Sequence, residues 1–554
     1  MVIDTATKWA LLALNHYPTV KNLFPAVACL LTLTTAAVAA PRSPILMDMV
    51  HNNPGEAPFD THYNDPKLLK DWGFGAKTFE LFESAQFGID WSAADPDIFP
   101  ADSPDRKWID VKGAELDKLY SATKAAGLQV YCHTDMVVLP KRLVAKYKME
   151  KTFGDISDPQ TQKFLRLGIG QMFQRFPQLD GLVIRIGETY LQGAPFHTGS
   201  IRSKDDPQRT IIPLMNLLRD EVCVKRNKKL FFRSWLSFDT SIEKYTQVSD
   251  GVETHPNLAI VVKHCEGDFR RGNPFSKVLG IGRHPQLVEV QCQREYEGKG
   301  AYPNYIANGV IEGFEEHTDQ SVRRLWDNGL TAGMSTWSRG GGWGGPYITN
   351  ELWCDVNMYV LSHWVQHPEK SEADVLRDYC TTVLGLNAED AKRFRRLCLL
   401  SAEATYRGIR STHNDISPWW TRDQGINRPE LPAPGEARQR VLDEKDEAVA
   451  MWNEIVDLAK TIKFRDPATQ EYALTSSLYG SLLYRIYRSE FRLMAVDANT
   501  DNASLKLLLD DYDRNWAQYR QLKADHPSCG TLYSDNDKAG IGAKVEDFRK
   551  RVAG

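Results

Sequence analysis

The chain has 554 residues, a formal net charge of −4 and a pI near 6.4, and charged residues make up 25% of it. This length suits two to four domains, or one large barrel with an accessory domain. Because the chain has no excess of positive charge, it lacks the basic surface that a phosphate backbone requires, which argues against nucleic acid as a partner.

The N-terminal segment has the pattern of a secretory signal peptide. A polar lead containing Lys8 and Lys21 precedes the apolar run LFPAVACLLTLTTAAVAA, in which Ala37-Val38-Ala39 forms an A-x-A cleavage site. We therefore predict that residues 1–39 are removed and that the mature protein is secreted or periplasmic, with no membrane attachment after cleavage. The alternative is a single membrane anchor, since about 20 apolar residues span a bilayer.

Eight cysteines follow the predicted signal peptide, and none belongs to a C-x-x-C pair. This spacing does not support a zinc site, and we predict no metal and no cofactor. An even number of cysteines in an exported chain permits disulfides, but three of these cysteines lie in apolar, strand-like runs. Buried free thiols are therefore an equally good interpretation, and the sequence leaves the pairing open.

Short apolar runs alternate with helix-like stretches from residue 43 to residue 348. Eight runs have the length and composition of strands: residues 44–53, 76–83, 128–138, 179–188, 230–238, 258–269, 287–296 and 332–339. Several helix-like stretches between them begin after Asp or Asp-Pro, which suits an N-cap followed by proline at the first helical position. Eight strands that alternate with helices predict an α/β fold, namely a (β/α)8 TIM barrel.

The pattern changes after residue 349, where apolar residues recur at i, i+3 and i+4. This helical period covers residues 350–366, 372–385, 388–407, 443–462 and 471–496. Residues 415–438 are rich in proline and glycine and are predicted to form a long loop. We therefore predict a catalytic barrel over residues 43–348, followed by an all-helical C-terminal domain over residues 349–554.

The stretch DGLVIRIGETY, residues 180–190, places an acid, Glu188, at the end of an apolar strand. An ionised carboxylate is costly there unless it is paired or solvated, so Glu188 is either a surface acid or a functional group. The chemistry of a TIM barrel takes place at the C-terminal ends of its strands. The predicted strands end in Asp48, His51, Glu80, Glu83, His133, Asp135, Arg185, Glu188, Arg233, Trp235, Lys263, Glu266, Asp268, Arg294, Glu295, Trp337 and Arg339. These side chains predict a polar, aromatic-lined pocket, and acids on several strands suit glycoside hydrolysis.

Three of these segments resemble, in order and spacing, catalytic strands of the α-glucuronidases of glycoside hydrolase family 67. They are residues 180–190, residues 258–280 and residues 287–305, and the helical run 351–380 is similar to the segment after that family's barrel. The resemblance extends from about residue 43 to the end of the chain. Its most specific motifs are Lys263-x4-Asp268-Phe269 and Gln293-Arg294-Glu295-Tyr296.

The resemblance implies a role for each catalytic position. Glu188 matches the family's general acid, and Asp268 and Glu295 match the two acids that together activate the hydrolytic water. Arg233 and Lys263 fall where the family has basic residues that face the pocket, and arginine binds carboxylates in a bidentate manner. By analogy the enzyme is exo-acting, metal-independent and inverting, with its acid and base about 6.5–9.5 Å apart.

Further residues are predicted to bind the substrate. Arg185 and Arg339 add positive charge at the pocket mouth, and His133 is suited to hydrogen-bond sugar hydroxyls. Trp337 is expected to form a floor on which the sugar stacks, and the glycine-rich residues 338–345 are expected to bring Trp343 over the pocket. Tyr190, just after the acid, completes the predicted set, which is Arg185, Arg233, Lys263, His133, Tyr190, Trp337, Arg339 and Trp343.

The sequence departs from the family pattern in three places. The family has a β-domain before its barrel, whereas here the predicted barrel starts directly after the signal peptide; the loop after Glu188 also differs, and Arg185 replaces a lysine. We therefore expect a divergent relative, and the sugar stays open. A neutral or otherwise modified sugar and a non-catalytic, glycan-binding barrel are the alternatives. Lys263 with Asp268, and Arg294 with Glu295, are alternatively structural ion pairs. The oligomeric state is also open, and a homodimer is compatible with the sequence.

Overall fold

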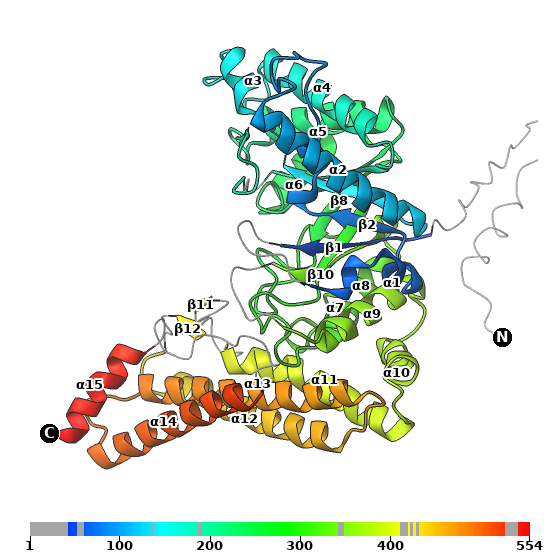
Figure 1. Cartoon of the computed structure of the whole chain (residues 1–554). Helices are drawn as coiled ribbons and strands as arrows, with labels where there is room; N and C mark the ends of the chain where they lie inside the picture. The colour runs from blue at the N-terminus through cyan, green and yellow to red at the C-terminus, as the bar shows by residue number, and fades with distance from the viewer. Residues whose placement is uncertain are drawn as a thin grey trace, which may run out of the picture. The chain divides into compact units, whose positions relative to one another are not determined.

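The computed structural model describes residues 43–52, 60–135, 137–186, 188, 191–341, 348–409, 419–421, 425–427, 431–526 and 541–554. The predicted signal peptide, residues 1–39, lies outside these ranges. From Pro44 to Gly554 the chain forms one compact unit, which begins with a barrel and ends with a set of packed helices (Figure 1).

Eight parallel strands close into a barrel, which confirms the predicted (β/α)8 fold. They are β1 (Ile45–His51), β2 (Ala76–Phe79), β3 (Gln129–Asp135), β5 (Gly181–Arg185), β7 (Lys229–Arg233), β8 (Leu258–Lys263), β9 (Gln286–Gln291) and β10 (Thr331–Gly340). Each of the eight apolar runs identified in the sequence overlaps one of these strands. Two short strands outside the barrel, β4 (Val138–Pro140) and β6 (His197–Gly199), pair in antiparallel fashion.

The barrel interior changes from apolar to polar along the strands. Its apolar layer includes Tyr131, Val183, Phe231, Val261 and Leu287, which belong to one buried cluster. Side chains alternate between the two faces of a strand, so the residues two positions further on also point inward. Those residues are His133, Arg185, Arg233, Lys263 and Glu289. The period of two therefore directs a layer of charged and imidazole side chains toward the C-terminal end of the barrel.

Helices surround the barrel. They are α1 (Pro66–Asp71), α2 (Pro104–Ala125), α3 (Lys141–Lys146), α4 (Pro159–Arg175), α5 (Ile212–Leu218), α6 (Ile242–Gly251), α7 (Ala307–Glu312) and α8 (Val322–Trp326). Asp65 and Asp158 cap α1 and α4 by accepting backbone N–H groups, and a proline occupies the first turn of each helix. These two caps confirm the helix starts expected from the Asp-Pro pairs.

Helix α9 (Leu352–Gln366) follows β10 and packs on the barrel beside α1. Its Gln366 amide donates to the carbonyl oxygen of Trp72 over 3.1 Å, and its Tyr359 ring meets the Trp72 ring edge-on at 5.7 Å. Asn357 donates to the carbonyl oxygens of Cys292 and Asn304, which lie after β9. Helix α9 therefore supports the C-terminal end of the barrel. The division of the chain at residues 348 and 349 stays a prediction.

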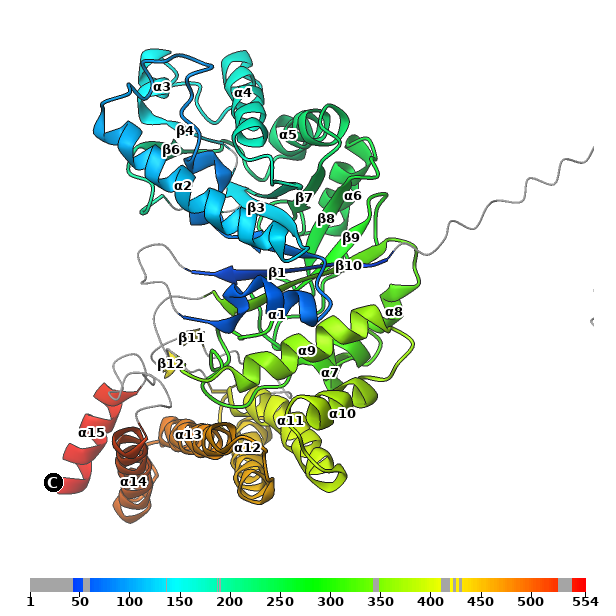
Figure 2. The ribbon, with the colours of Figure 1, turned by 45° about the vertical axis from the view of Figure 1, so that its right-hand side comes forward.

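The rest of the chain is mainly helical, as predicted. It contains α10 (Glu372–Thr382), α11 (Ala388–Ile409), α12 (Glu436–Thr461), α13 (Pro467–Met494), α14 (Asn502–Asp525) and α15 (Gly542–Ala553). Helices α11 to α14 pack against one another in succession (Figure 2). Residues 415–438 were predicted to form a loop throughout. In the structure this range contains the antiparallel pair β11 (Trp419–Thr421) and β12 (Gly425–Asn427) and the start of α12. Three-residue strands are too short to show a period of two in the sequence.

Seven of the eight cysteines after the predicted signal peptide lie in described segments, and all seven are buried free thiols. Cys529 lies outside the described residues. Among the helices of the described ranges, none is long and apolar enough to cross a membrane.

Candidate active site

Two bidentate ion pairs occupy the polar layer of the barrel. Arg185 donates to both oxygens of Asp135 at 2.9 and 3.0 Å, between the neighbouring strands β3 and β5. Arg233 donates to both oxygens of Glu289 at 2.6 and 2.7 Å, from β7 to β9 across β8. All four side chains are buried. The guanidinium groups of Arg185 and Arg233, which the sequence suggested for a substrate carboxylate, therefore each bind a carboxylate of the protein.

Two histidines lie in this cationic layer and are neutral. Burial, together with the positive charges of Arg185, Arg233 and Lys263, lowers the pKa of His51 to about 3. Burial and the charges of Arg233 and Arg185 hold the pKa of His133 well below its usual range. A neutral imidazole carries one N–H donor and one acceptor nitrogen, so each ring is suited to bind a hydroxyl group.

Several buried polar atoms at this end of the barrel have no hydrogen-bond partner among the described residues. They are Nδ1 of His51, both ring nitrogens of His133, Nη1 of Arg233, Nε1 of Trp235 and Oε2 of Glu80. Buried polar atoms in native proteins are nearly always hydrogen-bonded, to protein or to ordered water. Such atoms at the ends of β1, β2, β3 and β7 therefore mark a place where water or a ligand completes the bonding.

Lys263 and Asp268 lie close together at the end of β8. The Lys263 ammonium is 3.5 Å from Asp268 Oδ1 and lies over the rings of Trp235 and Phe269, at 4.2 and 4.4 Å from their centroids. The Asp268 side chain is 37% exposed, and its Oδ2 accepts a hydrogen bond of 2.7 Å from the Tyr296 hydroxyl. Asp268 is thus oriented by Lys263 of β8 and by Tyr296 of the loop after β9, and it keeps an accessible face.

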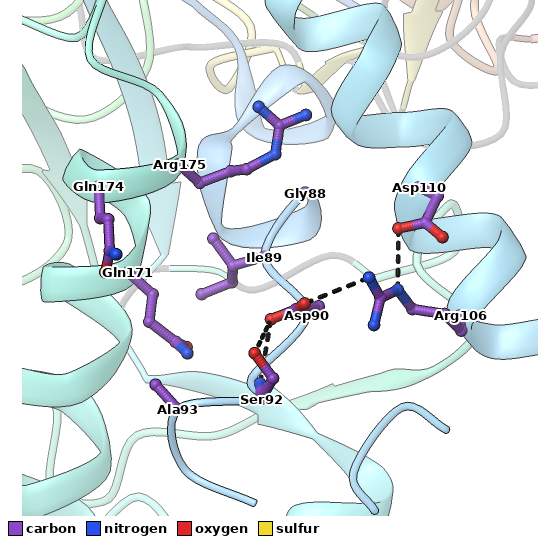
Figure 3. A pocket seen from close by; sticks show the side chains of 10 residues that line it. All are labelled: Gly88, Ile89, Asp90, Ser92, Ala93, Arg106, Asp110, Gln171, Gln174 and Arg175. Carbon is purple, nitrogen blue, oxygen red and sulfur yellow. Dashed lines mark hydrogen bonds and ion pairs between the residues drawn. The ribbon is translucent and has the colours of Figure 1, made fainter. Parts of the chain in front are cut away.

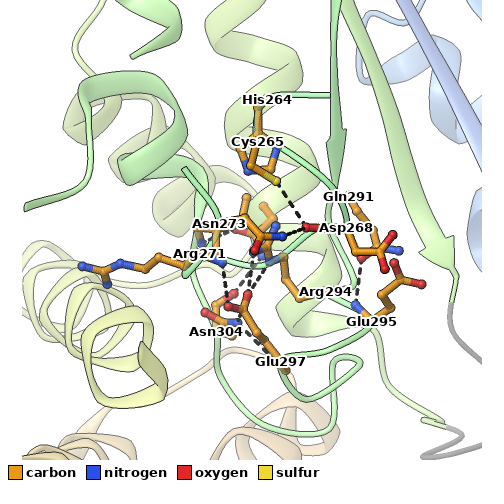
Figure 4. A network of polar contacts seen from close by, with 12 residues as sticks. His264, Cys265, Asp268, Arg271, Asn273, Gln291, Arg294, Glu295, Glu297 and Asn304 are labelled. Atoms are coloured by element: carbon orange, nitrogen blue, oxygen red, sulfur yellow. Dashed lines mark hydrogen bonds and ion pairs between the residues drawn. The ribbon is translucent and has the colours of Figure 1, made fainter. Parts of the chain in front are cut away.

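Glu295 lies in the loop after β9, next to the end of β10. Its backbone N–H donates to Gln291 Oε1 over 2.8 Å. Gly341 passes so close that a Cβ there would lie 2.7 Å from Glu295 Oε2, and its φ of +76° also favours glycine. Arg294, immediately before Glu295, has a φ of +60°, which is unusual for a residue with a side chain. Figure 4 shows Asp268 and Glu295 within the network that joins the two loops.

Glu188 is half-buried and follows β5. Burial raises the pKa of Asp135, the Arg185 guanidinium opposes the rise, and the negative charge of Glu188 adds to it. Glu188 therefore lies near the Arg185–Asp135 pair, at the barrel end where Asp268 and Glu295 also lie. The structure thus brings the three predicted catalytic acids to one end of the barrel.

The other predicted residues have different surroundings. Trp337 packs on Phe269 at 5.5 Å and on His51 at 4.8 Å between ring centroids, and its use as a floor for the sugar stays a prediction. Arg339 is ion-paired to Glu351, which also accepts a hydrogen bond from Thr61. Arg339 thus belongs to a network with Glu351 and Thr61. Tyr190 and Trp343 lie outside the described residues.

Sequence reasoning assigned no role to four residues of this site. Glu80 is buried, and burial together with the charge of Glu83 raises its pKa to about 8. Trp235 and Tyr296 contact Lys263 and Asp268, as described above, and Glu289 neutralises Arg233. Glu80 and Trp235 were visible as strand ends in the sequence. Tyr296 belonged to the motif Gln293-Arg294-Glu295-Tyr296, but no role followed from it. Glu289 sits inside an apolar run, so no pattern marked it.

Arg294 and Glu295 do not form the ion pair that was the structural alternative, because the Arg294 guanidinium contacts Glu297 at 2.6 Å instead. Lys263 and Asp268 do form one. Within the described residues, no three His, Cys, Asp or Glu side chains are grouped so that they could hold a metal ion.

A separate cavity of about 390 Å³ lies on the flank of the barrel, between α2, α4 and the segment after β2 (Figure 3). Its Arg106 is held between Asp90, at 3.3 Å, and Asp110, at 2.9 Å. Arg175, at the end of α4, contacts Asp117 at 2.6 Å. None of the predicted site residues lines this cavity, and both of its arginines are already paired.

Comparisons with known proteins identify the class of fold. No protein-family model and no curated protein sequence matches the chain. Among solved structures, the chain is similar to a GH138 enzyme targeting pectin rhamnogalacturonan II, with 11% identity and a TM-score of 0.54, over 92% of this chain and 84% of that one. It is also similar to an O-GlcNAc hydrolase of Thermobaculum terrenum, with 10% identity and a TM-score of 0.41, over 92% of this chain and 94% of that one.

The first similarity agrees with the (β/α)8 fold seen in the structure, and at this identity it shows the fold alone. These structural neighbours are glycoside hydrolases. The first of them belongs to family 138, so the resemblance to the family 67 α-glucuronidases stays a prediction.

Proposed function

We propose that this protein is a secreted, exo-acting glycoside hydrolase that removes a terminal α-linked uronic acid from plant or microbial polysaccharide fragments. The observation that carries the proposal is the grouping of Glu188, Asp268 and Glu295 at the barrel end where several buried donors have no partner in the described part of the chain. Chemistry in (β/α)8 enzymes takes place at this end. The fold shared with an enzyme that targets a pectin polysaccharide supports the same reaction class.

In the proposed reaction, Glu188 gives its proton to the glycosidic oxygen as the bond from that oxygen to the anomeric carbon breaks. Asp268 and Glu295 take up a proton from one water molecule, whose oxygen attacks the opposite face of the anomeric carbon. One water is consumed, and the products are the free sugar with inverted configuration and the shortened chain. Tyr296 and Lys263 orient Asp268 for this step.

The preference for a uronic acid rests on positive charge and unused donors. Lys263 lies at the barrel mouth, and Arg233 keeps one N–H group, on Nη1, that no described residue accepts. Trp235 Nε1, beside them, is a further donor that has no acceptor within the described ranges. A carboxylate on a terminal sugar would accept these bonds, and hydrogen bonds to charged partners are the stronger kind.

A direct experiment compares the wild type with Glu188→Gln on oligosaccharides capped with α-linked glucuronic acid. We expect the wild type to release the acid and the variant to be slower by roughly 10²- to 10⁴-fold, which is the usual contribution of a general acid. Glu115→Gln, in an exposed part of α2, serves as the control for removing a carboxylate elsewhere. Normal turnover by Glu188→Gln, with its thermal unfolding unchanged, would remove Glu188 from the mechanism.

Competition separates the proposed substrate from a neutral sugar. Free glucuronate is expected to inhibit the wild type more strongly than free glucose does, because only glucuronate offers a carboxylate to Lys263 and Arg233. Inhibition by neutral sugars alone would overturn the uronate preference and leave the hydrolase. Binding of capped oligosaccharides without any release would instead favour a glycan-binding barrel.

A further inference from the structure

We propose that Glu297 is a positioning residue that sets the spacing between Asp268 and Glu295, and that α11 supports it through Arg271. This inference rests on the proposed function, in which those two acids activate the hydrolytic water. It adds a residue that touches neither acid and ties the reaction to the helical part of the chain.

Glu297 joins the two loops that carry the acids. It is buried, with 2% of its surface exposed. Its Oε1 accepts the backbone N–H of Arg271, in the loop after β8, over 2.8 Å. Its Oε2 binds the guanidinium of Arg294, in the loop after β9, with 2.8 Å to Nε and 2.6 Å to Nη2. The loop of Asp268 and the loop of Glu295 thus share one carboxylate (Figure 4).

Arg294 needs this partner. Its side chain is 1% exposed, and a buried guanidinium without a counter-ion is strongly unfavourable. Its backbone has a φ of +60°, and such conformations persist only where the surroundings fix them. Because Glu295 is the next residue, any relaxation of Arg294 turns the Glu295 side chain. The ion pair with Glu297 therefore determines where the Glu295 carboxylate points.

Arg271 extends the connection to the helical region. Its guanidinium donates to Glu316 at 2.9 and 2.8 Å and to Glu403, on α11, at 2.6 Å. It lies between the rings of Phe314 and Tyr406, with centroids at 4.8 and 4.6 Å. Two carboxylates and two rings fix the Arg271 side chain, so its backbone N–H is presented to Glu297 from a rigid support.

The test uses Glu297→Gln and the milder Glu403→Gln, assayed on the uronide that the wild type hydrolyses. Glutamine keeps the shape of the side chain but removes the charge that Arg294 requires. We expect Glu297→Gln to lower kcat by about 10-fold or more while KM changes less than about threefold, because positioning acts on the chemical step. Glu403→Gln should lower kcat in the same direction by a smaller factor.

A double-mutant cycle separates positioning from simple support of the fold. In a Glu295→Gln background, Glu297→Gln should cause little further loss of kcat, since residues that act through one another are non-additive. The control is Glu312→Gln, which removes the acid of a similar bidentate pair with Arg323 away from the acid loops. This control should lower thermal stability without lowering kcat.

Each outcome of these experiments leads to a different conclusion. A wild type that hydrolyses the uronide while Glu297→Gln and Glu403→Gln keep its kcat would overturn this inference and leave the proposed function intact. Additive losses in the cycle would overturn it as well. A wild type that hydrolyses no uronide would overturn the proposed function, and this inference with it.

Discussion

Burial is the main cause of the pKa shifts of several titratable residues in this barrel. His51, His133 and His197 are buried and neutral, and burial is the main cause in each case. Glu80 shows the converse effect, since burial raises its pKa to about 8. A neutral imidazole and a protonated carboxyl can each donate a hydrogen bond to a sugar hydroxyl. The site therefore offers neutral donors beside charged ones.

His197 tests the effect of burial away from the predicted catalytic acids. Its ring lies among Phe87, Phe99 and Trp108, and burial together with the charge of Lys141 lowers its pKa to about 3. The ordinary pKa of an unfolded histidine is about 6.5, so the unfolded chain binds a proton below that pH while the folded chain does not. The contribution of the neutral His197 ring to the unfolding free energy is thus complete above about pH 6.5, and it is lost progressively as the pH falls toward 3.

We therefore expect His197→Phe to weaken the fall in unfolding free energy between pH 6.5 and pH 4, with little effect at pH 8. Urea unfolding at a series of pH values measures this difference. His367→Phe, on an exposed ring after α9, controls for the loss of a histidine as such. If His197→Phe follows the same pH dependence as the wild type, proton uptake by the buried ring does not contribute to acid unfolding.

The sequence identified site residues that lie at or just beyond the end of a predicted strand. It missed residues whose role depends on closure of the barrel. Lys263, Asp268 and Glu295 were visible because each lies at or just beyond the end of an apolar run. Glu289 looked like one polar residue within such a run. Its role as the partner of Arg233 exists only because β7 and β9 face the same interior. Pairing across a barrel depends on which strands enclose it, and no local pattern contains that information.

At the scale of elements, the seam between β1 and β10 closes the barrel. It contains an irregularity, because the register shifts between Met49 and Val50. Gly340, at the end of β10, has a φ of +93°, and a Cβ there would fall on the carbonyl oxygen of His51. The eight strands were predictable from the length and composition of their apolar runs. This shift was not, because it arises from the fit of two strands that are distant in the sequence.

Gly340→Ala should therefore destabilise the fold more than an equivalent change elsewhere. Gly329 is a matched control, since its φ of +78° imposes a similar backbone cost but nothing lies within 4 Å of a Cβ there. We expect Gly340→Ala to lower the unfolding free energy by at least about 2 kcal/mol more than Gly329→Ala does, because steric overlap adds to the cost of the conformation. Equal urea midpoints for the two variants would show that the seam tolerates a side chain.

At the scale of the whole molecule, the helical region contributes to the site. Helix α9 holds the segment after β9 through Asn357, and Glu403 on α11 holds Arg271, three residues after Asp268. Amphipathic periods in the sequence indicated these helices but not what they pack against. The structure shows that they support the loops with the predicted acids, so the barrel and the helices are expected to act as one catalytic unit.

We propose that the three acids hydrolyse a terminal α-linked uronide with inversion. The most direct measurement is proton NMR of a panel of oligosaccharides capped with α-linked uronic acid, recorded during the first minutes after the protein is added. We expect the released uronic acid to appear first in the β configuration and then to mutarotate. Initial release of the α anomer would contradict the inverting mechanism, and an absence of any release would contradict the proposed hydrolase.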